Sequence, residues 1–346
     1  MNRKKLRSLI LASVCAVLVY FGLNLIDAYT SVREPTAAHP TEIYANHLRD
    51  DLRMTFVRAI DQAEKSVILT IYSLTDNRII HALNKKADEG VEVVLVCDSK
   101  ASKGAFSRLS KKIHLLKQRP KGLMHQKILV IDGIKSWIGS ANMTTESLRL
   151  HGNLVIGAYD QKLAAFSTEK ALHMDQMLPH LNFKLGAQNA DFYFLPDAKQ
   201  GLEKLTSMIN TAKKTIKVAM FTWTHQDLAH AIVEARKRGI QVEVIMDHYS
   251  GNGASRQVVQ ILNEGKVPVA FSQGQSLLHY KMMIVDDQTL VNGSANWTQA
   301  AFSQNNDCFL VLYDLDSTQK KTLQALWQVI KDDSVAVAKD FYTHRE

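Results

Sequence analysis

HQKILVIDGIKSWIGSAN, residues 125–142, decides the organisation of the chain, because HYKMMIVDDQTLVNGSAN at residues 279–296 repeats its pattern. The residues that recur at one constant offset are His125 and His279, Lys127 and Lys281, Asp132 and Asp286, Gly139 and Gly293, Ser140 and Ser294, and Asn142 and Asn296. The segments upstream of the two motifs, 66–98 and 215–247, also match each other. We therefore interpret the body of the chain as a tandem duplication.

Each repeat has the pattern of helix, strand, helix and strand, followed by a long loop and a strand hairpin. The first two expected strands of each repeat are continuously apolar or β-branched, as buried parallel strands are. The strands expected in this way are 67–73, 91–96, 216–222 and 242–246. The motif strands 127–131 and 281–285 are expected to join the same sheets. This β-α-β order predicts an α/β fold with right-handed crossovers in both halves.

The composition is that of a globular protein with about two domains. The chain has 346 residues, of which 46% are hydrophobic and 22% are charged, and its formal net charge is +8. Its three cysteines form no C-x-x-C pair, which excludes a disulfide-dense scaffold and disfavours a finger-type zinc site. We predict an N-terminal signal or anchor helix at 1–27, a linker at 28–43, a first half at 44–190 and a second half at 191–346.

The N-terminus has the pattern of a membrane segment. Residues 1–7 contain four basic residues and no acidic one, and residues 8–26 are almost wholly apolar. About 20 apolar residues span a bilayer, and a basic flank keeps the N-terminus in the cytoplasm. We favour a membrane-spanning anchor over a cleaved signal peptide, because the run is long and lacks an A-x-A site. The predicted location is membrane-anchored with an extracytoplasmic body, or secreted if the segment is cleaved.

The repeated side chains suit chemistry on a phosphodiester. His125 and Lys127 share one face of a strand, and the returning strand delivers Ser140 and Asn142. Two such halves could converge on one cleft, where the lysines neutralise the phosphoryl charge and the asparagines and serines donate hydrogen bonds. One histidine would attack phosphorus, and the other would protonate the leaving oxygen and then activate water. The predicted catalytic residues are His125, Lys127, Asn142, His279, Lys281 and Asn296.

No metal or other cofactor is predicted, because the lysines supply the positive charge that this chemistry needs. The motif aspartates have the opposite strand parity to the histidines and lie where the chain turns. We therefore interpret Asp132 and Asp286 as hairpin-turn or strand-end residues. Gly139 and Gly293 would permit close approach of backbone or ligand.

The two motifs resemble that of the phospholipase D superfamily, H-x-K-x4-D followed by Gly-Ser and Asn. The resemblance covers roughly residues 44–335, and the compact halves look like the bacterial phospholipase D-like and nuclease-like type. It implies two α/β halves packed sheet to sheet, with one active site at their junction and both half-sites in one monomer. It also implies that His125 and His279 are the nucleophile and the general acid, and that Lys127 and Lys281 bind the phosphate.

The resemblance implies a carboxylate eleven residues after each motif asparagine, orienting a histidine. The second half has Asp307 at this position, whereas the first has Asn153. An amide cannot stabilise an imidazolium as a carboxylate does, so the two histidines are not equivalent. Which of them is the nucleophile stays open at this point. The predicted supporting residues are Asp132, Ser140, Asn153, Asp286, Ser294 and Asp307.

Positive charge is concentrated directly upstream of His125. Residues 99–131 contain no acidic residue, whereas 100–127 contain nine basic ones. A polyanionic partner follows, either nucleic acid or a phospholipid membrane. The predicted substrate-binding residues are Lys117, Arg119 and Lys121.

We favour hydrolysis of a phospholipid phosphodiester, mainly because of the predicted anchor. The alternative is a metal-independent nuclease acting on single-stranded nucleic acid. A phosphatidyltransferase and an inactive polyanion-binding protein are the weaker alternatives.

Overall fold

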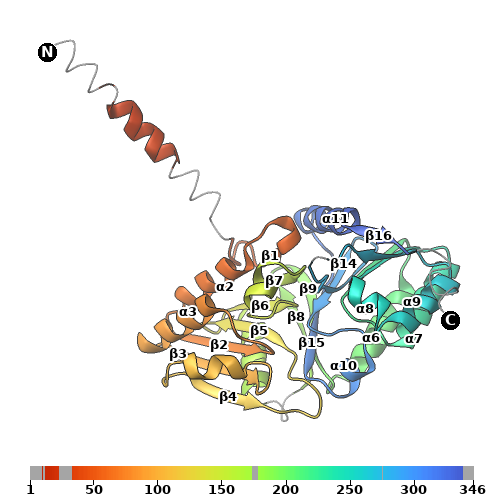
Figure 1. Cartoon of the computed structure of the whole chain (residues 1–346), viewed down its shortest axis with the longest axis horizontal. Coiled ribbons are helices and arrows are strands. Elements are labelled where there is room, and N and C mark those ends of the chain that lie inside the picture. Colours follow the sequence, from red (N-terminus) through yellow and green to blue (C-terminus); the bar gives the residue numbers. More distant parts are fainter. Residues whose placement is uncertain (1–9, 11, 23–32, 174–177, 275, 338–346) are drawn as a thin grey trace. The chain divides into compact units, whose positions relative to one another are not determined.

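A computed structural model describes residues 10, 12–22, 33–173, 178–274 and 276–337. The chain divides into two compact units, 1–33 and 34–346, and the second unit contains two mixed β-sheets (Figure 1). The strands of the first sheet are β1 (Thr41–Ala45), β2 (Ser66–Ile71), β3 (Glu92–Asp98), β4 (His114–Gln118), β5 (Lys127–Ile131), β6 (Lys135–Gly139) and β7 (Leu154–Tyr159). The strands of the second sheet are β8 (His180–Leu185), β9 (Gln188–Leu195), β10 (Thr215–Met220), β11 (Gln241–Met246), β12 (Val269–Ser272), β13 (Lys281–Val285), β14 (Thr289–Gly293), β15 (Asp307–Leu312) and β16 (Ser334–Ala336).

Helices connect these strands in both halves. Those of the first half are η1 (Asn46–Leu48), α2 (Leu52–Asp61), α3 (Asn77–Asp88), η2 (Lys103–Arg108), α4 (Thr145–Arg149) and α5 (Gln161–Leu172). Those of the second half are α6 (Gln200–Thr211), α7 (Gln226–Lys237), α8 (His248–Asn252), α9 (Arg256–Glu264), α10 (Gln299–Ser303) and α11 (Ser317–Asp332).

The two sheets repeat one topology. The first sheet has the strand order β4-β3-β2-β5-β6-β7-β1, and the second contains β12-β11-β10-β13-β14-β15-β9 with β16 and β8 added at its edges. In both, two parallel pairs are followed by an antiparallel motif hairpin. The motif strands β5 and β13 have the predicted bounds. β1 begins inside the segment predicted as linker, and β8, before the predicted boundary at 190, pairs with β9 in the second sheet.

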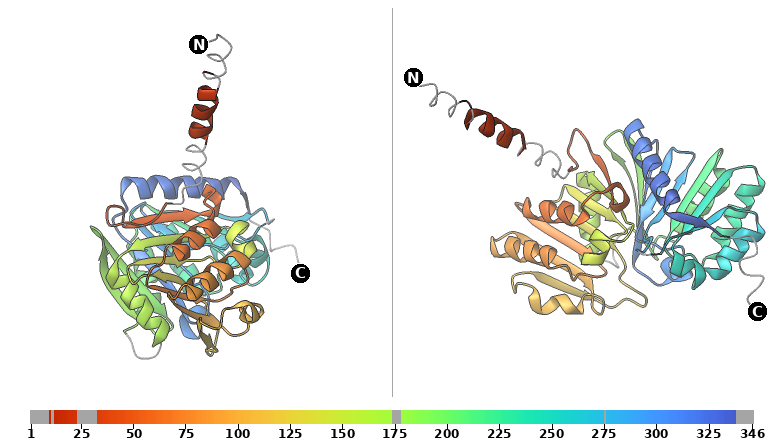
Figure 2. Two further views of the ribbon diagram at one scale, coloured as in Figure 1. Left: turned by 90° about the vertical axis from the view of Figure 1, so that its left-hand side faces the viewer. Right: turned by 45° about the horizontal axis from the view of Figure 1, so that its top comes forward.

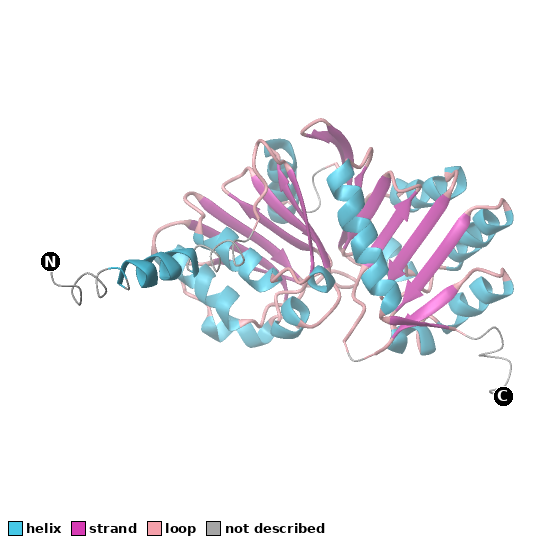
Figure 3. Cartoon of the chain, turned by 90° about the horizontal axis from the view of Figure 1, so that it is seen from above, coloured by secondary structure: helices cyan, strands magenta, loops and turns pink. Residues whose placement is uncertain are grey.

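The halves pack through the inner faces of their sheets, and helices cover the outer faces (Figures 2 and 3). One apolar cluster joins strands of both sheets with α5 and α11, and it contains Ile128 of β5 and Met282 of β13. Two further clusters lie on the outer faces, one beneath α2 and α3 and one beneath α6, α7 and α9. The predicted α/β fold with two sheets, consistent with two phospholipase D-like halves, is confirmed.

The motif glycines bring neighbouring strands into close approach. A Cβ atom on Gly139 would lie 2.2 Å from the carbonyl oxygen of Leu154, and one on Gly293 would lie 2.3 Å from that of Cys308. These carbonyls belong to the strand-start segments that follow each motif, so the neighbour that demands glycine is backbone. The approach places each motif serine directly beside the start of the next strand.

The predicted membrane-spanning helix at the N-terminus is contradicted. Among the residues that the structure describes, no helix has the length and hydropathy needed to cross a membrane. The location that rested on this helix, anchored with an extracytoplasmic body or secreted after cleavage, is withdrawn. The rest of the predicted signal or anchor segment lies outside the described residues.

Candidate functional site

Two backbone connections between the halves bring the motif histidines to the junction. The amide of His125 donates to the carbonyl of Asn306 (2.8 Å), and the amide of His279 donates to the carbonyl of Gly152 (2.9 Å). Each connection belongs to a short parallel bridge between the segment before a motif strand and the segment that starts a strand of the other half. Each histidine therefore lies beside the residue that begins β15 or precedes β7 in the opposite half.

His125 is paired with a carboxylate of the other half. Its Nδ1 lies 2.8 Å from Oδ1 of Asp307, which is fully buried. The same oxygen accepts a hydrogen bond from Oγ of Ser294 (2.7 Å). Because an ionised carboxylate only accepts hydrogen bonds, the Nδ1 of His125 carries the proton. In the neutral ring Nε2 is then the free nucleophilic nitrogen.

His279 is paired with an amide at the equivalent position. Its Nδ1 lies 3.0 Å from Oδ1 of Asn153. The amide group of Asn153 donates to the carbonyl of Ser147 (2.8 Å), and its oxygen accepts from Oγ of Ser140 (2.8 Å). These contacts make Asn153 the acceptor, so Nδ1 of His279 is the donor. The two histidines thus have the same orientation but partners of different charge.

The motif serines differ from the expectation that they donate to phosphate. Ser140 and Ser294 are fully buried, and each hydroxyl donates to the side chain that orients a histidine. Each hydroxyl oxygen also accepts a hydrogen bond from a backbone amide of the next strand, that of Leu154 for Ser140 (3.2 Å) and that of Cys308 for Ser294 (3.0 Å). A hydroxyl has one proton, and here that proton is used inside the protein.

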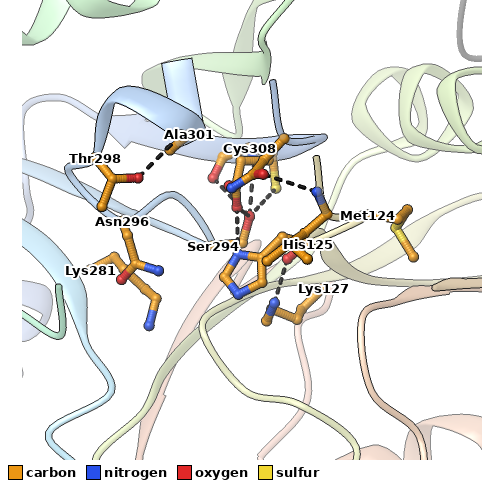
Figure 4. A network of polar contacts seen from close by, with 12 residues as sticks. Met124, His125, Lys127, Lys281, Ser294, Asn296, Thr298, Ala301 and Cys308 are labelled. Carbon is orange, nitrogen blue, oxygen red and sulfur yellow. Dashed lines mark hydrogen bonds and ion pairs between the residues drawn. The ribbon is translucent and has the colours of Figure 1, made fainter. Parts of the chain in front are cut away.

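The motif lysines are buried beside the histidines. Nζ of Lys281 donates to the carbonyl of His279 at 2.8 Å, and Nζ of Lys127 donates to the carbonyl of His125. Figure 4 shows Lys281 and Asn296 of the second half facing His125 and Lys127 of the first. The described structure therefore gathers ammonium, imidazole and amide groups from both halves in one place.

Burial lowers the proton affinity of this cluster. Burial lowers the pKa of Lys127 to about 7, and burial together with Lys127 lowers that of Lys281 well below its ordinary value. Burial and then Lys281 lower the pKa of His279 well below its usual range. Burial and then Lys127 also lower that of His125, although Asp307 acts in the opposite direction. A bound anion would oppose these shifts, because a nearby negative charge favours the protonated forms.

Asp307 keeps its negative charge in this site. Burial alone would raise its pKa, but His125 and Lys127 hold it below the ordinary value. Its second oxygen, Oδ2, is buried and has no hydrogen-bond partner among the described residues. The carboxylate is therefore ionised beside the histidine and the lysine of the first half, and only one of its two oxygens is hydrogen-bonded within the described part of the chain.

The remaining predicted residues divide into two groups. Asn142 and Asn296 are partly exposed at the ends of the motif hairpins, and Oδ1 of Asn296 accepts the amide of Thr222 (3.3 Å). Asp132 and Asp286 lie away from the histidines, at turns with φ of 54° and 55°. Each accepts hydrogen bonds from three consecutive backbone amides at the start of a neighbouring strand, at 64–66 or 213–215.

Across the part of the chain that is described, His, Cys, Asp and Glu form no group of three or more that could hold a metal ion.

The comparison with known proteins agrees with the duplicated geometry. The family described as "Cardiolipin synthase, PLD-like domain" matches residues 56–174 and 205–328, one match in each half. The chain belongs to the phospholipase D superfamily. The expectation drawn from the two motifs is confirmed at this level.

Relatives within the superfamily include enzymes named for cardiolipin. The chain is 26% identical over 132 residues to the mitochondrial cardiolipin hydrolase of Chlamydomonas reinhardtii, covering 38% of this chain and 59% of that protein. It is 24% identical over 314 residues to the cardiolipin synthase of Listeria welshimeri, covering 78% of this chain and 64% of that protein. The chain thus spans less than two thirds of either relative's length.

A solved structure has the same fold over most of its length. The phosphatidylserine synthase of Haemophilus influenzae Rd KW20 superposes with a TM-score of 0.71 at 14% identity, covering 91% of this chain and 90% of that one. At this identity the likeness concerns the fold alone.

The basic segment, residues 99–131, includes His125 and the basic residues that precede it. Lys117, Arg119 and Lys121 are all exposed. Nζ of Lys117 lies over the ring of Phe106 (4.5 Å), and Nε of Arg119 donates to Oγ of Ser99 (2.9 Å). Lys121 is followed by Gly122, whose backbone amide donates a hydrogen bond to the carbonyl of Gln304 in the other half (3.2 Å). Their role in substrate binding remains a prediction.

Three aromatic residues of the site were missed in the sequence. Tyr72 and Phe221 follow β2 and β10, and their rings pack against His125 (5.1 Å) and His279 (5.0 Å). They also lie beneath the ammonium groups of the motif lysines, at 5.1 Å and 4.8 Å. Their equivalent positions within the duplicated segments 66–98 and 215–247 could have revealed them. The third, His151, lies 6.2 Å from His279 and has no histidine counterpart in the second half.

Proposed function

We propose that this protein is a phosphodiesterase that hydrolyses a phospholipid phosphodiester through a phosphohistidine on His125. The observation that carries the assignment is the pairing of His125 with Asp307, while His279 is paired with the neutral Asn153. An imidazole that attacks phosphorus acquires positive charge. A carboxylate at its Nδ1 stabilises that charge, whereas an amide does not.

The first step forms the covalent intermediate. Nε2 of His125 attacks phosphorus, and the bond between phosphorus and the leaving oxygen breaks. The negative charge of the bound phosphodiester favours a second proton on His279, at Nε2. That proton moves to the leaving oxygen, so the product leaves as a neutral alcohol. Lys127 and Lys281, with the amides of Asn142 and Asn296, balance the charge on the phosphoryl oxygens.

The second step regenerates the protein. Neutral His279 takes a proton from water as the water oxygen bonds to phosphorus, and the bond between phosphorus and Nε2 of His125 breaks. The products are a phosphate monoester and free His125, and His279 has recovered the proton that it gave up. A lowered pKa makes protonated His279 a stronger acid, which fits the donation of its proton to the leaving oxygen.

A lipid substrate is supported by the surface next to the site and by the names of the relatives. Leu123, two residues before His125, is 42% exposed, and Leu150, beside His151, is 62% exposed. Exposed apolar side chains near basic ones suit an anionic lipid surface. The two relatives described above are named for hydrolysis and synthesis of cardiolipin.

Nucleic acid is the second candidate substrate, and the acid-free segment 99–131 favours it. Its lysines and arginines would neutralise backbone phosphates on any polyanion. Phe106 is the one aromatic residue of that segment and is covered by Lys117, so base stacking has little support there.

The test uses the full chain with two substrates in parallel. Phosphatidylcholine vesicles containing cardiolipin and a single-stranded DNA oligonucleotide are incubated with the wild type, His125→Ala and His279→Ala. Lipid hydrolysis that both substitutions abolish supports the proposal. DNA cleavage with the same dependence on both histidines would replace the lipid substrate by nucleic acid. Activity retained in His125→Ala would overturn the mechanism.

A further inference from the structure

A second pair of duplicated aspartates lies at the carboxyl ends of the central parallel strands. Asp98 ends β3 and Asp247 follows β11, at equivalent positions of the repeated segments 66–98 and 215–247. Asp98 is 7% exposed and Asp247 is fully buried. Neither belongs to the H-x-K-x4-D motif, and neither takes part in the steps proposed above.

The two oxygens of each of these carboxylates accept hydrogen bonds from different parts of the backbone. Oδ1 of Asp98 accepts the amides of Lys100 (2.9 Å) and Ala101 (3.0 Å). Oδ1 of Asp247 accepts the equivalent amides of Tyr249 and Ser250, both at 3.0 Å. These contacts of Oδ1 are ordinary capping of a turn.

The second oxygen reaches the peptide in front of a histidine. Oδ2 of Asp98 accepts the amide of Met124 (3.4 Å), and Oδ2 of Asp247 accepts the amide of Leu278 (3.0 Å). Met124 and Leu278 are buried, so these amides cannot turn to water instead. The next amide in each case, that of the histidine, donates to the opposite half.

The backbone at each histidine is therefore held from two sides. Successive amides of an extended chain point in opposite directions. At Met124 and His125 one amide binds Asp98 of the same half, and the next binds Asn306 of the other half. At Leu278 and His279 the partners are Asp247 and Gly152.

We propose that Asp98 and Asp247 are positioning residues that hold His125 and His279 in register with their partners across the junction. The inference rests on the proposed function for its kinetic consequences, but the geometry that it claims is independent of turnover. The motif aspartates Asp132 and Asp286 instead anchor the far ends of β5 and β13.

The carboxylates also supply negative charge to the buried lysines. Lys127 is faced by the charged or titratable groups of Asp307, Cys308, Asp98, His125, Lys281 and Tyr72. Burial lowers the pKa of Lys127, and Asp307 and then Asp98 act in the opposite direction. Lys281 faces Lys127, Asp307 and Asp247, and Asp247 raises its pKa. Removing either aspartate's charge would deprotonate the corresponding lysine at a lower pH.

The decisive substitutions are Asp98→Asn and Asp247→Asn in the full chain. Asparagine caps a turn as well as aspartate does, so the contacts of Oδ1 can remain. The group that replaces Oδ2 is an NH2, which cannot accept the amide of Met124 or Leu278. Asp316→Asn is the matched control, because Asp316 caps α11 through the equivalent two amides and lies outside both motifs.

We expect kcat on bis(p-nitrophenyl) phosphate to fall about tenfold to a hundredfold in each variant, because an error of about 1 Å at a catalytic group has that effect. The basic limb of the pH profile of kcat/KM should move to lower pH in both. Asp316→Asn should change neither quantity, and the melting temperatures should report folding. A merely structural role predicts lower melting temperatures with an unchanged pH profile, and that result would overturn the inference.

A measurement without turnover separates this inference from the proposed function. The 13Cε1 resonances of His125 and His279 are assigned with His→Gln variants and followed by NMR as a function of pH. Asp98→Asn should shift the His125 resonance and its titration, and Asp247→Asn those of His279. Resonances that stay unchanged would contradict positioning, whether or not the wild type is active. An inactive wild type with shifted resonances would contradict the proposed function alone.

Discussion

Asn153 Oδ1 lies 3.0 Å from Nδ1 of His279, in the position that Asp307 Oδ1 occupies against His125 at 2.8 Å. The two contacts have almost the same geometry and differ by one full charge. A carboxylate stabilises a positively charged imidazole and an amide leaves it unaided. The site is therefore symmetric in its backbone and asymmetric in its electrostatics, which supports the different roles proposed for the two histidines.

Asn153→Asp should raise the pKa of His279, because a negative charge would then face its Nδ1. His279 acts as an acid only when protonated, so the basic limb of its step should move to higher pH. Asp307→Asn should lower kcat by roughly a hundredfold, because the positive charge that His125 acquires would lose the carboxylate that stabilises it. The pH dependence of kcat for the two variants measures both effects. Equal losses of kcat and identical pH profiles in the two variants would contradict the asymmetry.

The order of the two steps can be tested with leaving groups of different acidity. p-Nitrophenolate departs without protonation, so His279→Ala should still release about one equivalent of it per protein and then stall as the phosphohistidine. His125→Ala should release none. Rapid-quench measurement of p-nitrophenol and mass spectrometry of the trapped protein follow the two events. A burst from His125→Ala that His279→Ala lacks would exchange the roles of the two histidines.

The spacing of residues predicted the motif strands, and the resemblance named Asp307 and Asn153 as orienting positions without saying which histidine each one contacts. β5 and β13 occupy the predicted residues 127–131 and 281–285, because apolar runs with a terminal aspartate turn are local signals. That Asp307 orients His125 depends on the bridge between Met124 and Asn306, which joins the two halves. Such a contact between halves has no signature in the residues that surround either member.

The serines and the N-terminal segment show two other limits of sequence reasoning. Spacing places Ser140 and Ser294 beside the site, but the direction of one hydroxyl proton depends on whether a side-chain acceptor such as Asp307 is nearer than the substrate. Hydropathy over residues 8–26 predicted a membrane span, whereas no helix among the described residues has the length and hydropathy to cross a membrane.

The motif glycines provide a prediction on stability alone. Gly139→Ala would place its Cβ 2.2 Å from the carbonyl oxygen of Leu154, so β6 and the start of β7 must separate. We expect a loss of about 1–3 kcal/mol or more in the free energy of unfolding, because buried backbone cannot yield as a flexible side chain does. Urea titration followed by circular dichroism measures this loss. Gly104→Ala, where nothing lies within 4 Å of the added Cβ, is the control that should remain close to wild type. Equal stability of the two variants would contradict the steric explanation.

The basic segment predicts how strongly the protein binds to an anionic surface. Lys117→Ala, Arg119→Ala and Lys121→Ala should each weaken binding to cardiolipin-containing vesicles about fivefold, because one basic residue near such a surface contributes about 1 kcal/mol. Binding is measured by co-sedimentation at several salt concentrations, with pure phosphatidylcholine vesicles as the uncharged reference. Lys237→Ala is the control, since Lys237 is exposed on α7 of the other half.

A loss that appears only with single-stranded DNA, and not with vesicles, would shift the substrate assignment to nucleic acid. A loss with both polyanions would mean that the segment recognises negative charge alone. Substrate choice would then depend on the apolar contacts of Leu123 and Leu150. Leu123→Ser and Leu150→Ser should in that case reduce vesicle hydrolysis and leave turnover of bis(p-nitrophenyl) phosphate unchanged, because neither side chain contacts the phosphoryl group in the proposed mechanism.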